Sequence, residues 1–116
     1  GSRVVEQPLV APNELDTKTA KFKFFYVNWC PYSKEALEKM KELEGSLSKY
    51  TYAGIHVVIE FIDCEHRKDD CALYKVDAYP TYKLETNSKM FEYVGPANIQ
   101  TYITFLKSAL GKEVPV

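Results

Sequence analysis

The chain contains three cysteines, and one of them stands apart from the other two. Cys30 lies in the run Trp29-Cys30-Pro31-Tyr32-Ser33, directly after an aromatic stretch. A cysteine thiolate attacks disulfide sulfurs, and it is stabilised where a helix begins, because free N–H groups and the helix dipole favour negative charge there. The alternative is a small buried apolar side chain without chemistry. The elements around Cys30 therefore decide between a nucleophile and a packing residue.

The residues on either side of Cys30 predict a strand before it and a helix after it. Lys21 to Val27 combines lysines with aromatic and β-branched residues, a composition typical of a buried strand. Pro31 is tolerated in the first turn of a helix, because its missing N–H would have no partner there. From Ser33 onward apolar residues recur at helical spacing, namely Ala36, Leu37, Met40, Leu43 and Leu47. The pattern places Cys30 at a helix N-terminus and at the carboxyl end of a strand.

Three further strands are expected later in the chain. Residues 55–62 are apolar and β-branched, and they should pair in parallel with strand 21–27, because a helix of suitable length separates the two. Residues 81–85 and 90–94 are joined by Asn87-Ser88, which is turn chemistry, so they should form an antiparallel hairpin. The sheet is therefore predicted to be mixed.

The remaining segments predict helices around this sheet. Residues 63–70 indicate a charged connection, followed by a short helix at 72–74, and Asn98 caps a last helix that Gly111 ends. The order β-α-β-α-β-β-α predicts an α/β fold with helices on both faces. We expect a domain over residues 19–116, preceded at residues 1–18 by an extension or an edge strand.

The composition excludes several classes of function. With 116 residues and 46% hydrophobic side chains the chain suffices for one domain, and its net charge of −1 predicts neither nucleic-acid nor membrane binding. We expect a monomer. Gly1-Ser2 is typical of an expression scar, so a natural signal or anchor could have been removed. The compartment, cytoplasm or secretory pathway, stays open.

The run from Trp29 to Ser33 resembles the active site of the thioredoxin superfamily. The aromatic strand and the Trp-Cys pair are similar to thioredoxin and protein disulfide isomerase domains, and Cys-Pro-Tyr is similar to glutaredoxin. Val76 with Tyr79-Pro80-Thr81 resembles the segment around that family's cis-proline. The resemblance implies a thioredoxin fold, a cis Tyr79–Pro80 bond, and Pro80 in contact with Cys30.

Two positions depart from the two-cysteine members of the family. Ser33 stands at the place of the second cysteine, and a hydroxyl cannot resolve a mixed disulfide, although it can bond the Cys30 thiolate or cap the helix. Three explanations of Ser33 stay open. The protein naturally has a single active-site cysteine, Ser33 is an engineered substitution that traps the mixed disulfide, or the domain has changed to a binding role. Phe24 stands six positions before Cys30, where the resemblance implies a buried acid. The alternative is that the match between this sequence and the family motif is shifted by one residue. Phe24 would then indicate only how the core is packed.

The resemblance implies a docking surface beside the nucleophile. It is formed by the apolar residues Trp29, Pro31, Tyr32, Tyr79 and Pro80, whose aromatic members could equally be ordinary half-buried side chains. The implied activity is thiol–disulfide exchange, of oxidoreductase or isomerase type. Cys30 would form mixed disulfides with protein or small-molecule thiols. No cofactor is expected beyond an external thiol such as glutathione.

Two other functions stay open for this site. The first is a redox-inactive adaptor that binds peptides or partner proteins with the same aromatic surface. The second is a glutathione-dependent oxidoreductase of glutaredoxin type, although the Thr-Val-Pro and Gly-Gly features of that class are absent from the sequence.

Cys64 and Cys71 form a second cysteine pair. They resemble a segment of secretory-pathway isomerase-like domains, and they could form a structural disulfide or remain free thiols, depending on the compartment. Zinc is a further alternative, with His66 as a third ligand, but the fourth ligand is missing and the spacing matches no common finger. No metal site is therefore predicted.

Overall fold

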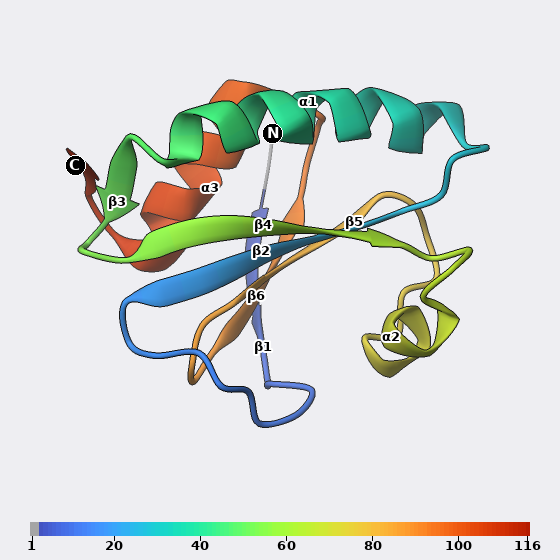
Figure 1. Cartoon of the computed structure of the whole chain (residues 1–116), viewed down its shortest axis with the longest axis horizontal. Helices are drawn as coiled ribbons and strands as arrows, with labels where there is room; N and C mark the ends of the chain where they lie inside the picture. The colour runs from blue at the N-terminus through green and yellow to red at the C-terminus, as the bar shows by residue number, and fades with distance from the viewer. Residues whose placement is uncertain (1–2) are drawn as a thin grey trace.

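The computed structural model describes residues 3–116 (Figure 1). Gly1-Ser2, the proposed expression scar, lies outside the described residues. The centre of the fold is a five-stranded sheet with the order β1-β6-β5-β2-β4. Its strands, in that order, are Arg3–Gln7, Met90–Val94, Thr81–Glu85, Thr19–Tyr26 and His56–Asp63.

The pairing of the strands confirms the predicted mixed sheet. β2 and β4 are parallel along their whole length, and β5 is antiparallel to β2 on its other side. β5 and β6 form the predicted antiparallel hairpin, and β1 pairs antiparallel with β6 at the edge of the sheet. The carboxyl ends of β2 and β4 thus lie side by side, and Cys30 follows β2 at this end of the sheet.

Helices lie on both faces of the sheet, as predicted. The long helices α1 (Pro31–Leu47) and α3 (Ile99–Leu110) cover one face, where they share a core with side chains of β2, β4 and β5 (Figure 1). The short helix α2 (Lys68–Leu73) places Cys71 in a second cluster on the other face. No helix among residues 3–116 is long and apolar enough to cross a membrane.

The alternation of lysine and phenylalanine in β2 reflects the two different faces. Phe22 and Phe24 point into the core beneath α1 and α3, whereas Phe25 belongs to the second cluster. The opposite face is polar in its middle, where Lys23 lies 3.7 Å from the buried carboxylate of Glu85. The attraction between Lys23 and Glu85 compensates for the removal of both charges from water. A strand with lysines can therefore lie in the middle of the sheet.

One local prediction was wrong, and one element was missed. α2 begins at Lys68 rather than at residue 72, because Asp69 and Asp70 occupy its first turn, where acidic side chains complement the helix dipole. α1 continues through Gly45 to Leu47, in line with the predicted apolar spacing, and the burial of Leu47 offsets the low helix propensity of glycine. A small second sheet, β3 (Tyr50–Tyr52) with β7 (Glu113–Pro115), was not predicted, because three-residue strands carry too little pattern.

Candidate active site

Cys30 lies at the first turn of α1. It is the N-cap residue, its backbone is extended, and its carbonyl accepts a hydrogen bond from the Lys34 N–H at 3.0 Å. Pro31 occupies the first helical position, and no acidic residue lies in the first turn. Cys30 is a free cysteine, and the residue is partly exposed. The helix terminus therefore offers unpaired N–H groups and a positive dipole end beside a free thiol.

Three aromatic residues, Trp29, Tyr32 and Tyr79, lie at the same end of the fold as Cys30. Trp29 is 68% exposed and Tyr32 is 75% exposed, unusually high values for such large apolar side chains. The rings of Trp29 and Tyr79 meet edge to face, with centroids 6.5 Å apart. Both Tyr79 and Cys30 pack against the second core cluster. The structure thus brings the predicted nucleophile and part of the predicted docking surface together at one end of the sheet.

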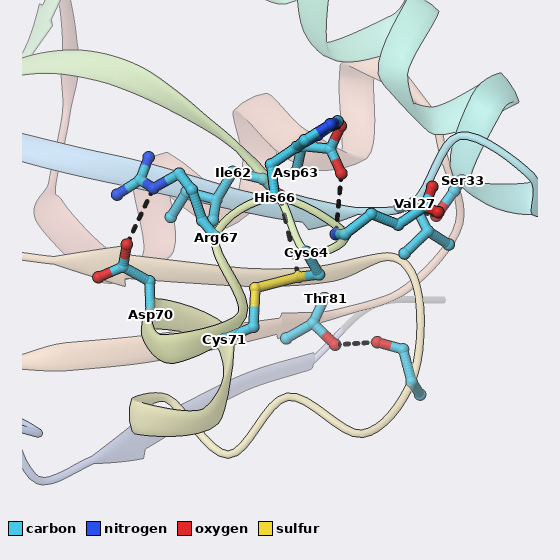
Figure 2. The surroundings of a disulfide bond; sticks show 12 residues. Val27, Ser33, Ile62, Asp63, Cys64, His66, Arg67, Asp70, Cys71 and Thr81 are labelled. Atoms are coloured by element: carbon cyan, nitrogen blue, oxygen red, sulfur yellow. Dashed lines mark hydrogen bonds and ion pairs between the residues drawn. A yellow bond between two sulfur atoms is a disulfide. The ribbon is translucent and has the colours of Figure 1, made fainter.

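The turn before β5 contains the predicted proline. The Tyr79–Pro80 peptide bond is cis, and the hydroxyl of Thr81 donates a hydrogen bond to the Ala78 carbonyl at 2.7 Å (Figure 2). That bond ties the first residue of β5 to the turn, so Tyr79 and Pro80 are held where the strand begins. Contact between Pro80 and Cys30 stays a prediction.

Ser33 is fully buried in the first turn of α1. Its hydroxyl oxygen accepts a hydrogen bond from the backbone N–H of Val27 at 3.3 Å, and both residues appear in Figure 2. Ser33 is the third residue of the helix and Cys30 is the N-cap, so the prediction that Ser33 caps the helix was wrong. The hydroxyl instead ties α1 to the loop after β2. A bond from its proton to the thiolate stays a prediction.

Phe24 is fully buried in the core beneath α1. Its ring stacks on Tyr26 with centroids 5.5 Å apart and lies 5.3 Å from the ring of Tyr82. Neither neighbour in the sequence, Lys23 or Phe25, is acidic, so a shift of one residue would not bring an acid to this place. β2 as a whole contains no carboxylate that could accept a proton from a resolving group.

The sequence analysis missed the role of Asp63, the last residue of β4. Its carboxylate accepts hydrogen bonds from the Asn28 side chain at 3.2 Å and from the Glu65 N–H at 2.9 Å. It also pairs with His66 at 2.9 Å, and Asp63 and His66 are labelled in Figure 2. Burial opposes ionisation, but the bonds from His66 and Glu65 outweigh it and lower the pKa of Asp63. Asp63 therefore stays charged and fixes the loop that leads to Cys30. The sequence does contain a signal for this role: Asp63 is an acidic residue at the end of the strand predicted to lie parallel to the strand before Cys30.

Cys64 and Cys71 form a disulfide in the structure, with Cα atoms 5.8 Å apart (Figure 2). This decides between the three alternatives that the sequence left open, since a bonded sulfur is neither a free thiol nor a zinc ligand. The bridge is buried against Phe25 and Ile62, in the cluster on which Cys30 packs. It joins the end of β4 to α2. Cys30 is thus the only free cysteine among residues 3–116, which include all three cysteines of the sequence.

Removing this bridge is expected to destabilise the domain. The double substitution Cys64→Ala and Cys71→Ala should lower the free energy of unfolding by about 2–3 kcal/mol, because the bridge closes a loop with a sequence separation of 7 in the unfolded chain. Urea denaturation followed by far-ultraviolet circular dichroism measures the change. Cys30→Ala is the matched control and should have a smaller effect, since Cys30 is partly exposed and unbridged. Equal stability of the double variant and the wild type would contradict this role.

Comparisons with known proteins agree with the geometry. The thioredoxin family profile matches residues 15–108. A probable protein disulfide-isomerase A4 of Caenorhabditis elegans is 32% identical over 94 residues, which cover 78% of this chain and 15% of that protein. The endoplasmic reticulum resident protein 44 of Bos taurus is 29% identical over 86 residues, which cover 72% of this chain and 21% of the relative.

A solved structure shows the same fold. The crystal structure of human ERp44 superposes with a TM-score of 0.70 at 22% identity, covering 83% of this chain and 29% of that one. The chain thus spans only 15% and 21% of the length of the two curated relatives given above. The order of strands and helices, the site at the start of α1 and the match over residues 15–108 lead to one conclusion: the chain belongs to the thioredoxin family.

Proposed function

We propose that this domain carries out thiol–disulfide exchange through Cys30 alone. The observation that supports this most directly is the free, partly exposed Cys30 at the first turn of α1. Ser33 stands where two-cysteine members of the family have the resolving cysteine. The Cys30 thiolate attacks one sulfur of a substrate disulfide. A Cys30–substrate disulfide forms, the substrate S–S bond breaks, and the other substrate sulfur leaves as a thiolate.

An external thiol completes the reaction. Its thiolate attacks the mixed disulfide at the substrate sulfur and releases Cys30 as a thiolate, so that the substrate has exchanged one disulfide partner for another. Glutathione, a partner protein or a second thiol of the substrate can supply this group. Cys64 and Cys71 cannot supply this thiol, because their sulfurs are bonded to each other. Such a site favours isomerisation, thiol tethering or deglutathionylation over net reduction.

The substrates that we propose are protein disulfides and thiols in the secretory pathway. The exposed rings of Trp29 and Tyr32 offer an apolar contact for a polypeptide beside the sulfur. A buried structural disulfide is typical of proteins that fold in an oxidising compartment. One relative is named for residence in the endoplasmic reticulum, which supports the same compartment.

A glutathionylated peptide tests this activity. With excess glutathione present, the wild-type domain should release glutathione from the peptide as oxidised glutathione, and Cys30→Ser should not. Coupling the product to glutathione reductase follows the rate continuously. The variant with both Cys64→Ala and Cys71→Ala, assayed where it is folded, should retain activity. Activity in Cys30→Ser equal to that of the wild type would refute the proposal.

The aromatic side chains at the site should determine how well substrate binds. Replacing both Trp29 and Tyr32 by alanine should lower kcat/KM for a protein-derived disulfide peptide by about tenfold, equivalent to roughly 1.4 kcal/mol. Both side chains are mostly exposed, so the free energy of unfolding should change little. The loss should fall mainly on KM, and a reaction with a small aliphatic disulfide should be nearly unaffected. A uniform loss on both substrates would contradict a docking role.

A peptide-binding adaptor is the second candidate, favoured by the same exposure of Trp29 and Tyr32. An adaptor needs the rings and not the sulfur. Fluorescence anisotropy with a labelled peptide that lacks cysteine distinguishes the two functions. If Cys30→Ser binds that peptide as tightly as the wild type, while neither protein supports exchange, the domain is an adaptor.

A further inference from the structure

The outer edge of β4 has no partner strand among residues 3–116. β4 ends the five-stranded sheet and is paired along its length with β2. Directly before β4, Ile55 forms an isolated antiparallel bridge with Tyr52, so the free part of the edge begins at β4 itself. The strand is eight residues long, its register with β2 is continuous, and its sequence HVVIEFID has neither lysine nor proline. Lysine, proline and bulges are the usual protections of a free edge. β1 at the opposite edge differs, since it begins with Arg3 and is followed directly by Pro8.

The backbone hydrogen bonds show which groups of β4 face outward. The N–H of His56 donates to the Lys18 carbonyl at 2.8 Å, and the N–H of Cys64 donates to the Tyr26 carbonyl at 2.9 Å. Alternate residues of a strand direct their peptide groups to opposite sides, so the even-numbered residues bond β2. The N–H and C=O groups of Val57, Ile59 and Phe61 therefore point away from the sheet. They form a row of unpaired donors and acceptors, as an extended polypeptide requires.

A hollow of about 320 Å³ lies beside this edge. It is lined by Glu44, Leu47 and Ser48 from the end of α1 and by residues 56–59 of β4. Figure 1 shows α1 running above β4. The helix thus roofs one side of the edge, where the lining contains Leu47, Val57 and Ile59. On the other face of the sheet Val58 is 51% exposed.

We propose that the β4 edge binds an extended polypeptide segment by strand addition. The segment pairs with Val57, Ile59 and Phe61, which requires about five or six residues at ~3.3 Å each. Its alternate side chains enter the hollow beneath α1 or lie against Val58, so an alternating pattern with apolar residues fits both faces. This surface is separate from the Cys30 site, and the inference does not rest on the function proposed above.

The position of α1 favours a single strand over a second copy of the domain. Paired β4 strands of two copies would lie about 4.8 Å apart. Each copy would place its own α1 above the paired β4 strands. The two helices would then clash, because packed helices need axes about 8–10 Å apart. A segment without a covering helix meets no such conflict. An extended tail of a partner is therefore the occupant that fits.

A tethered strand tests the proposal at a high local concentration. An alternating threonine–valine segment of about six residues is attached after Val116 through a Gly-Ser linker of about 15 residues, whose mean reach is ~20 Å. In the matched control two adjacent residues of the segment are proline, so that one of them faces β4 in either register. Hydrogen exchange of individual amides is followed by nuclear magnetic resonance in both proteins and in the untethered chain.

We expect the amides of Val57, Ile59 and Phe61 to exchange about tenfold or more slowly with the tethered strand than with the proline control. In the untethered chain these amides should exchange faster than those of Val58, Glu60 and Ile62. Equal rates with both tethers would overturn the proposal. So would slow exchange of the three outward amides in the untethered chain, because the edge would then not be free. Protection that rises with the concentration of the untethered chain would show a second copy there instead.

Discussion

Replacing Ser33 by cysteine is expected to convert a long-lived mixed disulfide into a short-lived one. A thiol at this position lies one helical turn from Cys30, where residues three apart are neighbours. It can attack the Cys30–substrate disulfide from within the molecule, and such proximity corresponds to a very high effective concentration. The lifetime of the mixed disulfide should fall by about a hundredfold or more. Rapid acid quenching and intact-protein mass spectrometry measure it.

The matched control is Ser33→Ala, which removes the hydroxyl without adding a thiol. It should lose the bond from the Val27 N–H, worth about 1 kcal/mol of stability, and should keep the long-lived intermediate. Reduction of insulin disulfides with dithiothreitol should rise in Ser33→Cys alone. The gain should be incomplete while Phe24 remains, because β2 contains no buried acid to accept the proton of the new thiol. An unchanged lifetime in Ser33→Cys would show that position 33 does not reach the intermediate.

The largest loss of stability is expected from Phe24→Asp. Truncation of a buried phenylalanine costs about 3–5 kcal/mol, and burial of a carboxyl among the rings of Tyr26 and Tyr82 adds to it. The sum approaches the ~5–15 kcal/mol total stability of a small domain. Phe24→Asp should therefore be largely unfolded at 25 °C, as shown by circular dichroism and the absence of a cooperative urea transition.

Phe24→Leu is the control for this position, with an expected cost of about 1–1.5 kcal/mol, because volume and apolarity are largely kept. A Phe24→Asp variant that unfolds cooperatively within about 1 kcal/mol of the wild type would mean that the space around residue 24 admits an acid. The interpretation of Phe24 as an apolar replacement would then be wrong.

The elements around Cys30 were predictable because the signals for them are local. Pro31 marks the start of α1, and the apolar spacing from Ala36 to Leu47 repeats over several turns, so both ends of the pattern are visible in the sequence. The hairpin of β5 and β6 was predicted from its turn chemistry at Asn87-Ser88. The parallel pairing of β2 with β4 followed from the length of the helix between them.

The parts that were not predictable depend on contacts between distant segments. Tyr52 of β3 pairs with Glu113 of β7, a sequence separation of 61 residues, and no local pattern predicts that pairing. The Cys64–Cys71 bridge forms because α2 turns back toward the end of β4. The charged residues before Cys71 carry no pattern that predicts this turn. The bond between Asn28 and Asp63 arises only when two parallel strands place their ends together.

The central claim is that Cys30 forms a mixed disulfide that no group within the domain resolves. The most direct test is a single-turnover reaction of the wild-type domain with a disulfide-bonded peptide, sampled by mass spectrometry, with glutathione added only after the adduct has formed. The predicted result is a peptide adduct on Cys30 that persists until glutathione is added and then disappears. Spontaneous decay of the adduct before glutathione is added, with Cys30 released as a free thiol, would contradict the account.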